Sequence, residues 1–407
     1  MRIFHVSWEY PPVIYGGLGR HVLALSRAQA AAGHDVTVVT QRPTGTATVE
    51  DHDGVRVVRT SAPTPPVRRD LPGLMAWTAD LDRQLVATLQ RLESEPPPQV
   101  VHAHDWVVEH AATKARQLWS APLVTTIHAT EAGRHSGWVS GEPSETIYAS
   151  EWRLARISST VITCSEAMNR EVRTLYQLPA DRVVTIPNGI DLTEWQSSPP
   201  DREQPVDEDP LIVFVGRLEW EKGIHVLIDA AQRIAPTVAA RFIIAGTGTQ
   251  SDRLHAQAAN HPAIEFAGPV ADADVRQLYS RATVVVVPSL YEPFGIVALE
   301  AAAAGAPLIV SDVGGLAEIV DDGRTGLVVP ANDPQSLATA IRSVIADPVA
   351  ARRRAATLSS ELPDRFTWSR IAERTVASYE LALRMKAPPG DRDGKSAPPK
   401  PRGQLLP

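Results

Sequence analysis

The sequence predicts an α/β protein of two domains, each built on a parallel sheet with helices on both faces. Short apolar runs of strand character alternate with helix-like stretches along almost the whole chain, a pattern typical of βαβ units. At 407 residues the chain is too long for one ordinary hydrophobic core. A proline-rich, acidic segment near the middle interrupts the pattern, so we expect one α/β series on each side of it.

These observations divide the chain into five segments. We expect an N-terminal domain over residues 1–195, a linker over 196–210 and a second domain over 211–366. A helical pattern returns over 367–386. The tail over 387–407 is rich in proline and nearly free of large apolar side chains, which predicts disorder.

Each expected strand is a short apolar run bounded by polar or turn-forming residues. The first is Ile3–Val6, which is followed by a glycine-rich loop and by a helix over His21–Ala32 that Gly33 closes. The other strands expected in the first domain are Val36–Val39, Val55–Arg59, Val100–Ala103, Leu123–Ile127, Val161–Thr163 and Val183–Ile186. Those expected in the second domain are Leu211–Val215, Arg241–Ala245, Ile264–Phe266, Thr283–Val287 and Leu308–Val310.

The composition is that of a globular protein, with 43% hydrophobic and 21% charged residues. The formal net charge is −7, whereas a protein that binds a polyanion such as DNA ordinarily needs a basic surface. We therefore expect no nucleic-acid partner. Any phosphate on a ligand must be met by a few placed cations and by backbone amides.

The chain carries a single cysteine, Cys164, so no intramolecular disulfide can form. Cys164 lies in an apolar run, and we interpret it as a buried small side chain rather than a nucleophile. The first residues read as a strand without the features of a signal peptide, and no run approaches the ~20 apolar residues that cross a bilayer. We expect a cytoplasmic protein whose contact with membranes is at most peripheral.

Gly16-Gly17-Leu18-Gly19 lies between the first strand and the first helix. Glycines there let backbone amides approach an anionic group at the helix N-terminus. The spacing is not the G-x-G-x-x-G of dinucleotide-binding folds, and the same glycines could simply make a tight turn. From the residues alone both interpretations stay open.

Two histidine-containing motifs end strands of the first domain. His102-Ala103-His104-Asp105 follows one strand and His128 follows another, at the edge of an open α/β sheet that faces the ligand crevice. Histidine and aspartate bind many metal ions, but no further cluster in the sequence is spaced to complete a site, so we favour a hydroxyl-binding Asp105 and expect no metal. His128 could offer a bound sugar a donor and an acceptor, or it could be a packed histidine satisfied internally.

Two cations follow the first strand of the second domain. Arg217 and Lys222 lie five residues apart on the loop between that strand and a helix. If they converge, they could neutralise a diphosphate leaving group, the main electrostatic demand when a phosphate departs. The alternative is a pair of solvated surface charges.

Two glutamates flank the start of a helix in the second domain. Glu292 lies just before the helix that begins at Ile296, and Glu300 lies inside that otherwise apolar helix. Backbone amides around Phe294, Gly295 and Ile296 can receive a phosphate. Glu300 could hold two vicinal hydroxyls of a ribose; the alternatives are a helix-dipole role for Glu292 and a solvated Glu300.

Together these motifs resemble the retaining glycosyltransferases of family four, which have the two-domain GT-B fold. Glu292 and Glu300 match the E-x₇-E motif of that family in its Pro-Ser-x-x-Glu-Pro-Phe-Gly context. The resemblance covers nearly the whole chain except the tail. It also takes in the glycine-rich loop, Ile186–Asp191, Gly216–Gly223 and Ser311–Gly315.

The resemblance implies two Rossmann-like domains with a donor in the cleft between them, and a last helix that crosses back to the first domain. A nucleotide-diphosphate sugar would be the donor, with neither metal nor other cofactor. The residues assigned to it would be Gly17 at the distal phosphate, Arg217 and Lys222 at the departing diphosphate, Phe294, Gly295 and Ile296 around the phosphates, and Glu300 at the ribose. Glu292 and His128 would contact the transferred sugar, and Asp105 would line the acceptor side.

Ser7–Pro12 and Thr126–Trp138 are similar to an actinobacterial subgroup of 1,4-α-glucan glucosyltransferases, including those linked to glycogen and to methylglucose lipopolysaccharide. The subgroup implies retaining transfer of glucose from ADP- or UDP-glucose to an α-1,4-glucan or a related glucosyl acceptor. Bacterial glycogen synthases usually carry a lysine shortly before the glycine-rich loop, where this chain has Val13-Ile14-Tyr15. The donor base is therefore left open.

Three other functions are compatible with these motifs. A family-four transferase could use another acceptor, either lipid-linked or a sugar phosphate. A GT-B nucleotide-sugar 2-epimerase would release nucleotide without an acceptor. The third is a glycan-binding protein without catalysis, and the retention of every charged motif argues against it.

Overall fold

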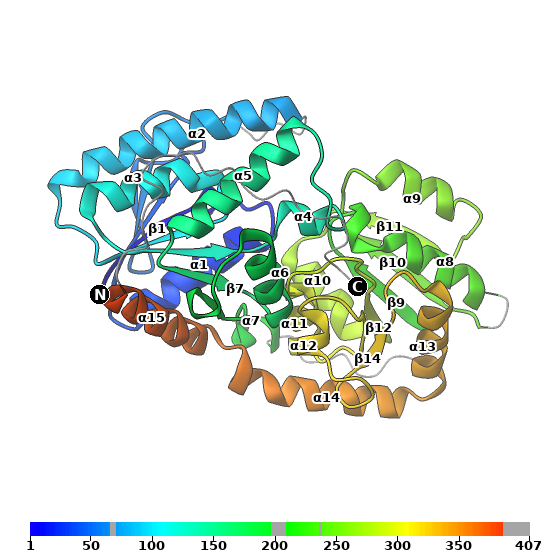
Figure 1. Ribbon diagram of the computed structural model, residues 1–407. Helices are drawn as coiled ribbons and strands as arrows, with labels where there is room; N and C mark the ends of the chain where they lie inside the picture. Colours follow the sequence, from blue (N-terminus) through cyan, green and yellow to red (C-terminus); the bar gives the residue numbers. More distant parts are fainter. Residues whose placement is uncertain (66–70, 197–208, 236–237, 386–407) are drawn as a thin grey trace. The chain divides into compact units, whose positions relative to one another are not determined.

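The computed structural model describes residues 1–65, 71–196, 209–235 and 238–385, and the chain divides into two compact units (Figure 1). Unit 1 comprises Met1–Gly189 and Trp368–Pro407, and unit 2 comprises Ile190–Thr367. The first boundary falls before the expected one at residue 195 because helix α7 (Leu192–Gln196) packs against α11 (Ile296–Ala303) of unit 2. Most of the expected linker and the expected disordered tail lie outside the described residues.

Unit 1 is built on an eight-stranded sheet with the strand order β3-β4-β2-β1-β5-β6-β7-β8. Neighbouring strands run parallel except for β3 and β4, which are antiparallel. The strands are β1 (Arg2–Val6), β2 (Asp35–Thr40), β3 (Val49–His52), β4 (Val55–Arg59), β5 (Val100–His104), β6 (Leu123–Ile127), β7 (Thr160–Thr163) and β8 (Val183–Thr185). The sequence did not predict β3, because its residues are exposed or half-buried and carry no apolar alternation.

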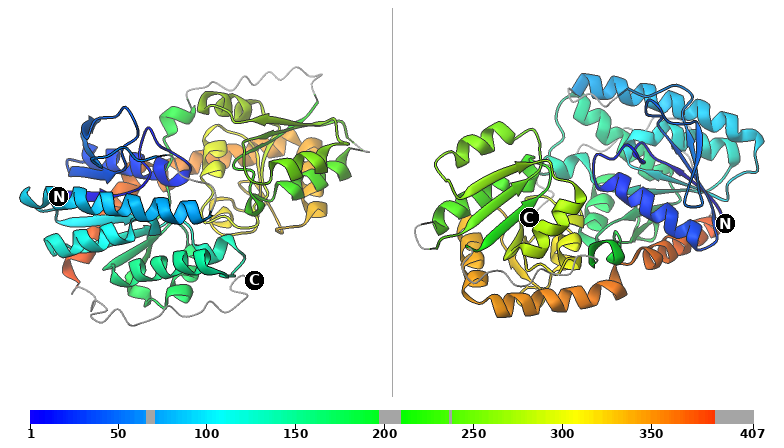
Figure 2. Two further views of the ribbon diagram at one scale, coloured as in Figure 1. Left: turned by 90° about the horizontal axis from the view of Figure 1, so that it is seen from above. Right: turned by 180° about the vertical axis from the view of Figure 1, so that it is seen from behind.

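Successive strand residues of unit 1 are buried in separate cores on opposite faces of the sheet. The larger helices are α1 (Gly17–Ala31), α2 (Leu71–Arg91), α3 (Glu109–Trp119), α5 (Glu142–Ile157), α6 (Glu166–Tyr176) and α15 (Trp368–Arg384). Ile3 packs with α1 and α15, whereas Phe4 packs with α2, α3 and α5. Figure 1 shows the two sets of helices on either side of this sheet, and Figure 2 shows them from two further directions. As expected, the last helix packs on the first domain, mainly on α1.

Unit 2 is built on a six-stranded parallel sheet with the order β11-β10-β9-β12-β13-β14. Its strands are β9 (Leu211–Val215), β10 (Arg241–Ala245), β11 (Ile264–Gly268), β12 (Val284–Val287), β13 (Leu308–Ser311) and β14 (Leu327–Val329). Its other helices are α8 (Ile224–Ile234), α9 (Ser251–Ala258), α10 (Asp272–Arg281), α12 (Leu316–Ile319), α13 (Pro334–Ala346) and α14 (Pro348–Arg365). The short β14 was not predicted. The predicted class of two parallel-sheet α/β domains is confirmed.

In each sheet the chain reverses its direction of growth at one strand. β1 lies between β2 and β5 in unit 1, and β9 lies between β10 and β12 in unit 2. Ligands of open α/β sheets bind outside the carboxyl ends of the strands at such switch points. The candidate residues follow β1, β5 and β6 in unit 1, and β9 and β12 in unit 2, so the sheet order brings each set to one edge.

Two smaller observations complete the fold. Within the described parts of the chain, every helix is too short or too polar to span a membrane. Cys164 is buried, which confirms the expected small core side chain.

Candidate active site

The carboxylate of Glu9 holds the glycine-rich loop of unit 1 in place. Its Oε2 accepts hydrogen bonds from the backbone N–H groups of Tyr15 (2.8 Å) and Gly16 (3.2 Å). A Cβ at Gly19 would lie 2.9 Å from the same oxygen, so this glycine is needed for close packing. A Cβ at Gly16 would instead meet nothing within 4 Å. The open side of the loop is therefore at Gly16, directly before Gly17, where α1 begins without a side-chain cap.

Asp105 and His128, predicted from separate strands, are in direct contact. Oδ1 of Asp105 accepts the backbone N–H of His128 at 2.7 Å, which joins the loops after β5 and β6. Burial raises the pKa of Asp105 to about 6, and the His128 amide and Arg134 offset part of the rise. Asp105 also has a φ of 60°, a region that few residues other than glycine adopt. Its carboxylate thus positions His128, whatever role it has toward an acceptor.

Asp105 borders a cluster of four buried histidines and the half-buried His128, which sequence reasoning did not assemble. The cluster consists of His5 on β1, His21 on α1, His102 and His104 on β5, and His128 after β6. Burial lowers the pKa of His5 to about 4 and the pKa values of His21 and His128 to about 3. Burial, with the neighbouring rings, lowers the pKa values of His102 and His104 well below the ordinary range. All five rings are therefore neutral near pH 7.

Two triplets within this cluster have ring nitrogens within 4.8 Å of one another. They are His5, His102 and His104, and His21, His104 and His128. Neutral imidazoles of this kind can ligate zinc or copper. The premise that no further residues could complete a metal site was wrong, because β1, α1 and the loop after β6 supply them from distant parts of the sequence. That the protein needs no metal stays a prediction.

In unit 2, Lys222 and Glu292 form an ion pair at the switch point. Nζ of Lys222 lies 2.8 Å from Oε2 of Glu292, and the hydroxyl of Ser289 donates to the same oxygen at 3.1 Å. The two side chains are only 18% and 13% exposed, so this pair is not a solvated surface contact. Gly223, with a φ of 66°, lets the two loops touch, since a Cβ there would lie 2.0 Å from the carbonyl oxygen of Pro288.

Arg217 lies on the same loop but is placed differently. Its side chain is 54% exposed, and its guanidinium donates to Oε1 of Glu221 at 3.1 Å. Convergence of Arg217 and Lys222 on one diphosphate therefore requires a change of the Arg217 rotamer. The alternative of a solvated charge describes Arg217 in this structure but not Lys222.

Helix α11 carries the remaining candidate residues of unit 2. Gly295 is its N-cap with a φ of 106°, and a Cβ there would lie 2.5 Å from Cδ2 of Leu316, so only glycine fits. The helix begins at Ile296 without a side-chain cap, and Phe294 is buried just before it. Glu300 is only 6% exposed. This excludes a solvated Glu300, and a buried carboxylate requires polar partners.

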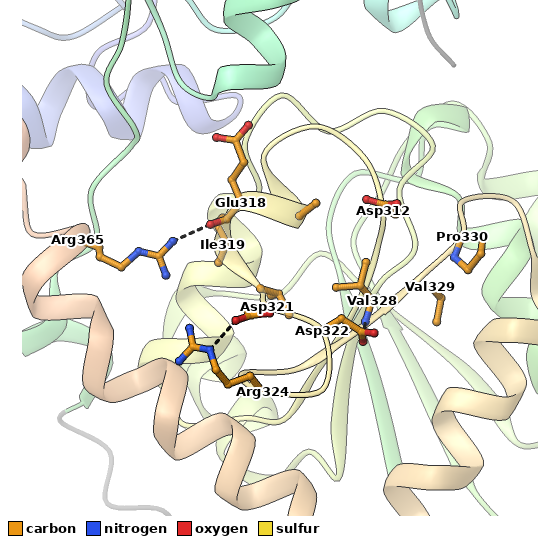
Figure 3. Close-up of a pocket in the computed structure, with 12 residues that line it drawn as sticks. Asp312, Glu318, Ile319, Asp321, Asp322, Arg324, Val328, Val329, Pro330 and Arg365 are labelled. Carbon is orange, nitrogen blue, oxygen red and sulfur yellow. Dashed lines mark hydrogen bonds and ion pairs between the residues drawn. The ribbon is translucent and has the colours of Figure 1, made fainter.

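A separate open pocket of about 730 Å³ lies in unit 2 beside α12 and β14. Its two arginines are already paired, because Arg324 donates to Asp321 and Arg365 donates to the carbonyl oxygen of Glu318 (Figure 3). The candidate residues after β9 and β12, and those on α11, are not among its lining residues. The pocket is therefore distinct from the candidate site of unit 2.

Comparison with known proteins finds a glycosyltransferase family model for each half of the chain and relatives along its whole length. The model named Glycosyltransferase Family 4 matches residues 15–194, and the model named Glycosyl transferases group 1 matches residues 199–359. A glycogen synthase of Mycobacterium tuberculosis is 44% identical, covering 96% of this chain and 97% of the relative. An alpha-maltose-1-phosphate synthase of Mycolicibacterium smegmatis is 33% identical, covering 93% and 99%. The solved structure of a sucrose-phosphate synthase from Thermosynechococcus elongatus superposes with a TM-score of 0.77 at 25% identity, covering 93% and 98%.

These similarities extend along nearly the full length of both chains in each comparison. The two family models divide the sequence close to the boundary between units 1 and 2. The residues gathered at the two sheet edges lie within the matched segments. The chain therefore belongs to the family-four glycosyltransferases and has their GT-B fold.

Proposed function

We propose that this chain transfers glucose, with retention of configuration, from ADP- or UDP-glucose to an α-1,4-glucan or a related glucosyl acceptor. The observation that carries the proposal is the largely buried Lys222–Glu292 pair beside the uncapped start of α11. A shielded cation next to free helix amides suits the diphosphate of a departing nucleotide. The identity of 44% to a glycogen synthase supports glucose and a glucan as substrates.

On this proposal unit 2 binds the nucleotide. Lys222 stabilises the negative charge that develops on the departing diphosphate, and the exposed Arg217 swings in to join it. Amides around Gly295 receive a phosphate at the start of α11. Glu300 accepts hydrogen bonds from the ribose hydroxyls, which gives its buried carboxylate a function.

The transferred glucose contacts Glu292 and His128, and a backbone amide at Gly17 contacts the distal phosphate. The bond between the anomeric carbon and the diphosphate oxygen breaks, and the acceptor hydroxyl bonds to that carbon on the same face. The hydroxyl proton passes to the departing phosphate oxygen, so no protein nucleophile is needed. We propose that no metal takes part, because Lys222, Arg217 and helix amides supply the positive charge.

The acceptor side is assigned to Asp105, whose carboxylate is buried beside His128. A second acceptor class has support from the relatives. The relative from Mycolicibacterium smegmatis is named alpha-maltose-1-phosphate synthase, and maltose 1-phosphate is a glucosyl unit added to glucose 1-phosphate. Glucose 1-phosphate is therefore the principal alternative acceptor.

A panel of nucleotide sugars, with nucleotide release as the readout, tests the proposal. Without an acceptor, release should be slow, since a closed site excludes water from the activated glucose. Adding a malto-oligosaccharide should raise release many-fold, and NMR of the product should show a new α-1,4 linkage. Acceleration only by glucose 1-phosphate would move the assignment to that acceptor. Nucleotide release without acceptor and with an epimerised sugar would show that the transferase proposal is wrong.

A further inference from the structure

A continuous chain of hydrogen bonds runs through the core of unit 1 and ends at His128. It starts at Gln29 on α1, whose Oε1 lies 2.7 Å from Nε2 of His5. Nδ1 of His5 lies 3.0 Å from Nε2 of His104, and Nδ1 of His104 lies 3.3 Å from Nε2 of His128. Gln29, His5 and His104 are all fully buried. Each intermediate ring uses both nitrogens, so the proton position in one ring dictates that in the next.

The proton positions along the chain follow step by step. A neutral imidazole has one donor and one acceptor nitrogen, and Oε1 of Gln29 can only accept, so His5 carries its proton on Nε2. Nδ1 of His5 then accepts, which places the proton of His104 on Nε2. Nδ1 of His104 in turn accepts from Nε2 of His128. Nδ1 of His128 is left as an acceptor, and it has no hydrogen-bond partner among the described residues.

Which group donates and which accepts in each of these hydrogen bonds depends on the orientation of the side-chain amide of Gln29. Its Nε2 donates to the hydroxyl of Tyr379 on α15 at 3.0 Å. That hydroxyl lies 2.6 Å from Nδ1 of His102, whose Nε2 lies 2.7 Å from the hydroxyl of Thr126. With the phenol accepting from the amide and donating to His102, each of these groups meets a complementary partner. A rotated amide would reverse every proton position as far as His128.

We propose that Gln29, His5 and His104 are positioning residues that hold His128 in the tautomer protonated on Nε2, so that its Nδ1 accepts a hydrogen bond from a hydroxyl of the bound sugar. The inference rests on the proposed contact between His128 and the transferred glucose. A ring held in one tautomer before the sugar arrives loses no free energy in selecting it, which is the advantage of a preorganised site. The lowered pKa values of these histidines keep the rings neutral, so the alternation of donors and acceptors holds at pH 7.

NMR of the full-length chain labelled with ¹⁵N-histidine reads the tautomer directly, without any substrate. Protonated and unprotonated ring nitrogens have well-separated ¹⁵N shifts, and the spectrum of His128→Gln identifies the signals of His128. We expect Nε2 to be protonated and Nδ1 to be unprotonated. A wild-type protein with the proton on Nδ1, or with an even mixture of tautomers, overturns the proposal.

Variants test whether the distant residues set this tautomer. Gln29→Met keeps the side-chain size but removes both amide groups, and Tyr379→Phe removes only the hydroxyl that orients the amide. Both should turn His128 into a mixture of tautomers. Thr125→Val is the matched control. It removes a buried hydroxyl on the same sheet that is hydrogen-bonded to Ser158 at 2.7 Å but takes no part in the row of hydrogen bonds from Gln29 to His128. The proposal is overturned if His128 keeps a single tautomer in folded Gln29→Met, or if Thr125→Val produces the same mixture of His128 tautomers.

Kinetics separate this inference from the proposed function. In the transfer reaction Gln29→Met should lower kcat about tenfold with little change in the KM for the donor, because one oriented hydrogen bond to the reacting sugar is lost. An equal fall in Thr125→Val would indicate general damage and would count against the positioning role. If no donor supports transfer while the tautomer still depends on Gln29, the proposed function fails and the positioning of His128 stands.

Discussion

The two units bury polar groups in very different ways, although both present candidate residues at the carboxyl edge of a parallel sheet. Among the described residues of unit 2, the buried polar side chains are those of Ser289, Glu300, Ser311 and Thr325. The core of unit 2 is otherwise apolar. Among its described residues, unit 1 buries histidines from several elements together with Gln29 and six acidic side chains, those of Glu9, Asp82, Asp105, Glu109, Glu131 and Glu151.

This difference in buried polar groups suits two kinds of ligand, one uncharged and one charged. A neutral ring can be buried deeply when its nitrogens are bonded, whereas a charge is best kept near the edge with its partner. On the proposed function, unit 2 meets a charged diphosphate with a lysine at the sheet edge, whereas the side chains of unit 1 meet an uncharged sugar with neutral imidazoles, and only the backbone amide at Gly17 contacts a phosphate. The transfer rate should therefore fall sharply when one charge of unit 2 is removed, whereas the stability of unit 1 should depend on pH.

The largest effect is expected from removing the lysine of unit 2. Lys222→Ala should lower the transfer rate about 10²–10³-fold, as expected for one preorganised charge contact. Steady-state kinetics with circular dichroism as a check on folding measures this. Arg324→Ala is the matched control, since Arg324 is also an ion-paired cation of unit 2 but lines the separate pocket. Near-wild-type turnover in folded Lys222→Ala would remove the site assignment.

The second effect concerns acid and unit 1. His21 has a folded pKa of about 3, lowered by burial from the ordinary 6.5. Below pH 6.5, His21 takes up a proton in the unfolded chain but not in the folded one. The contribution of His21 to the free energy of unfolding is therefore fully present above pH 6.5 and is lost as the pH falls toward 3. Between pH 7 and pH 5 the imidazole of His21 alone lowers the free energy of unfolding by about 2 kcal/mol. Asp105 acts in the opposite sense, because its raised pKa of about 6 adds stability as the pH falls through 6.

The variant His21→Phe isolates this contribution, because the opposing effect of Asp105 is common to both proteins. The free energy of opening is measured by hydrogen exchange of the β1 and β5 amides at pH 7 and pH 5. The decrease in this free energy of opening from pH 7 to pH 5 should be smaller in the variant by about 2 kcal/mol. Amides of β9 and β12 in unit 2 should show no difference between the two proteins. An identical loss in β1 and β5 would contradict the role of His21.

The sequence predicted well those features that depend on local pattern and sheet topology. Apolar runs located strands such as β9 and β12, and residues that follow parallel strands meet at one edge. This was enough to place Lys222 and Glu292 at the edge of unit 2. The burial of Glu300 was also foreseeable, since it stands within an apolar helix. The unpredicted strands β3 and β14 are short and only partly buried, so they leave little apolar signal.

The polar interior of unit 1 could not be predicted in the same way. His102 and Tyr379 are 277 residues apart in the sequence, and their contact depends on α15 packing on unit 1. The chain from Gln29 to His128 depends on strand order and on side-chain rotamers, which no local pattern encodes. Glu9 was also missed; a glutamate just before a glycine-rich loop was the available signal.

A smaller effect is expected from the one buried glutamate of α11. Glu300→Gln keeps the size of the side chain but removes its charge, so the affinity for ADP or UDP should fall about tenfold. Calorimetry with the 2′-deoxy nucleotide supplies the control. If the carboxylate holds the ribose, the variant should lose less affinity for the deoxy compound than for the ribonucleotide. Equal losses for both would argue against a ribose contact.

No effect is expected from removing divalent metals, although unit 1 contains two histidine triplets. In the triplet His5, His102 and His104, every ring nitrogen already lies within hydrogen-bond distance of another group. A metal there would have to replace the contact between His5 and His104, so burial of these rings does not require one. Transfer rates should therefore be equal with and without EDTA, and elemental analysis should find no stoichiometric metal. Activity that disappears in EDTA and returns with one divalent ion would show that a histidine triplet binds a functional metal and that unit 1 does more than hold an uncharged sugar.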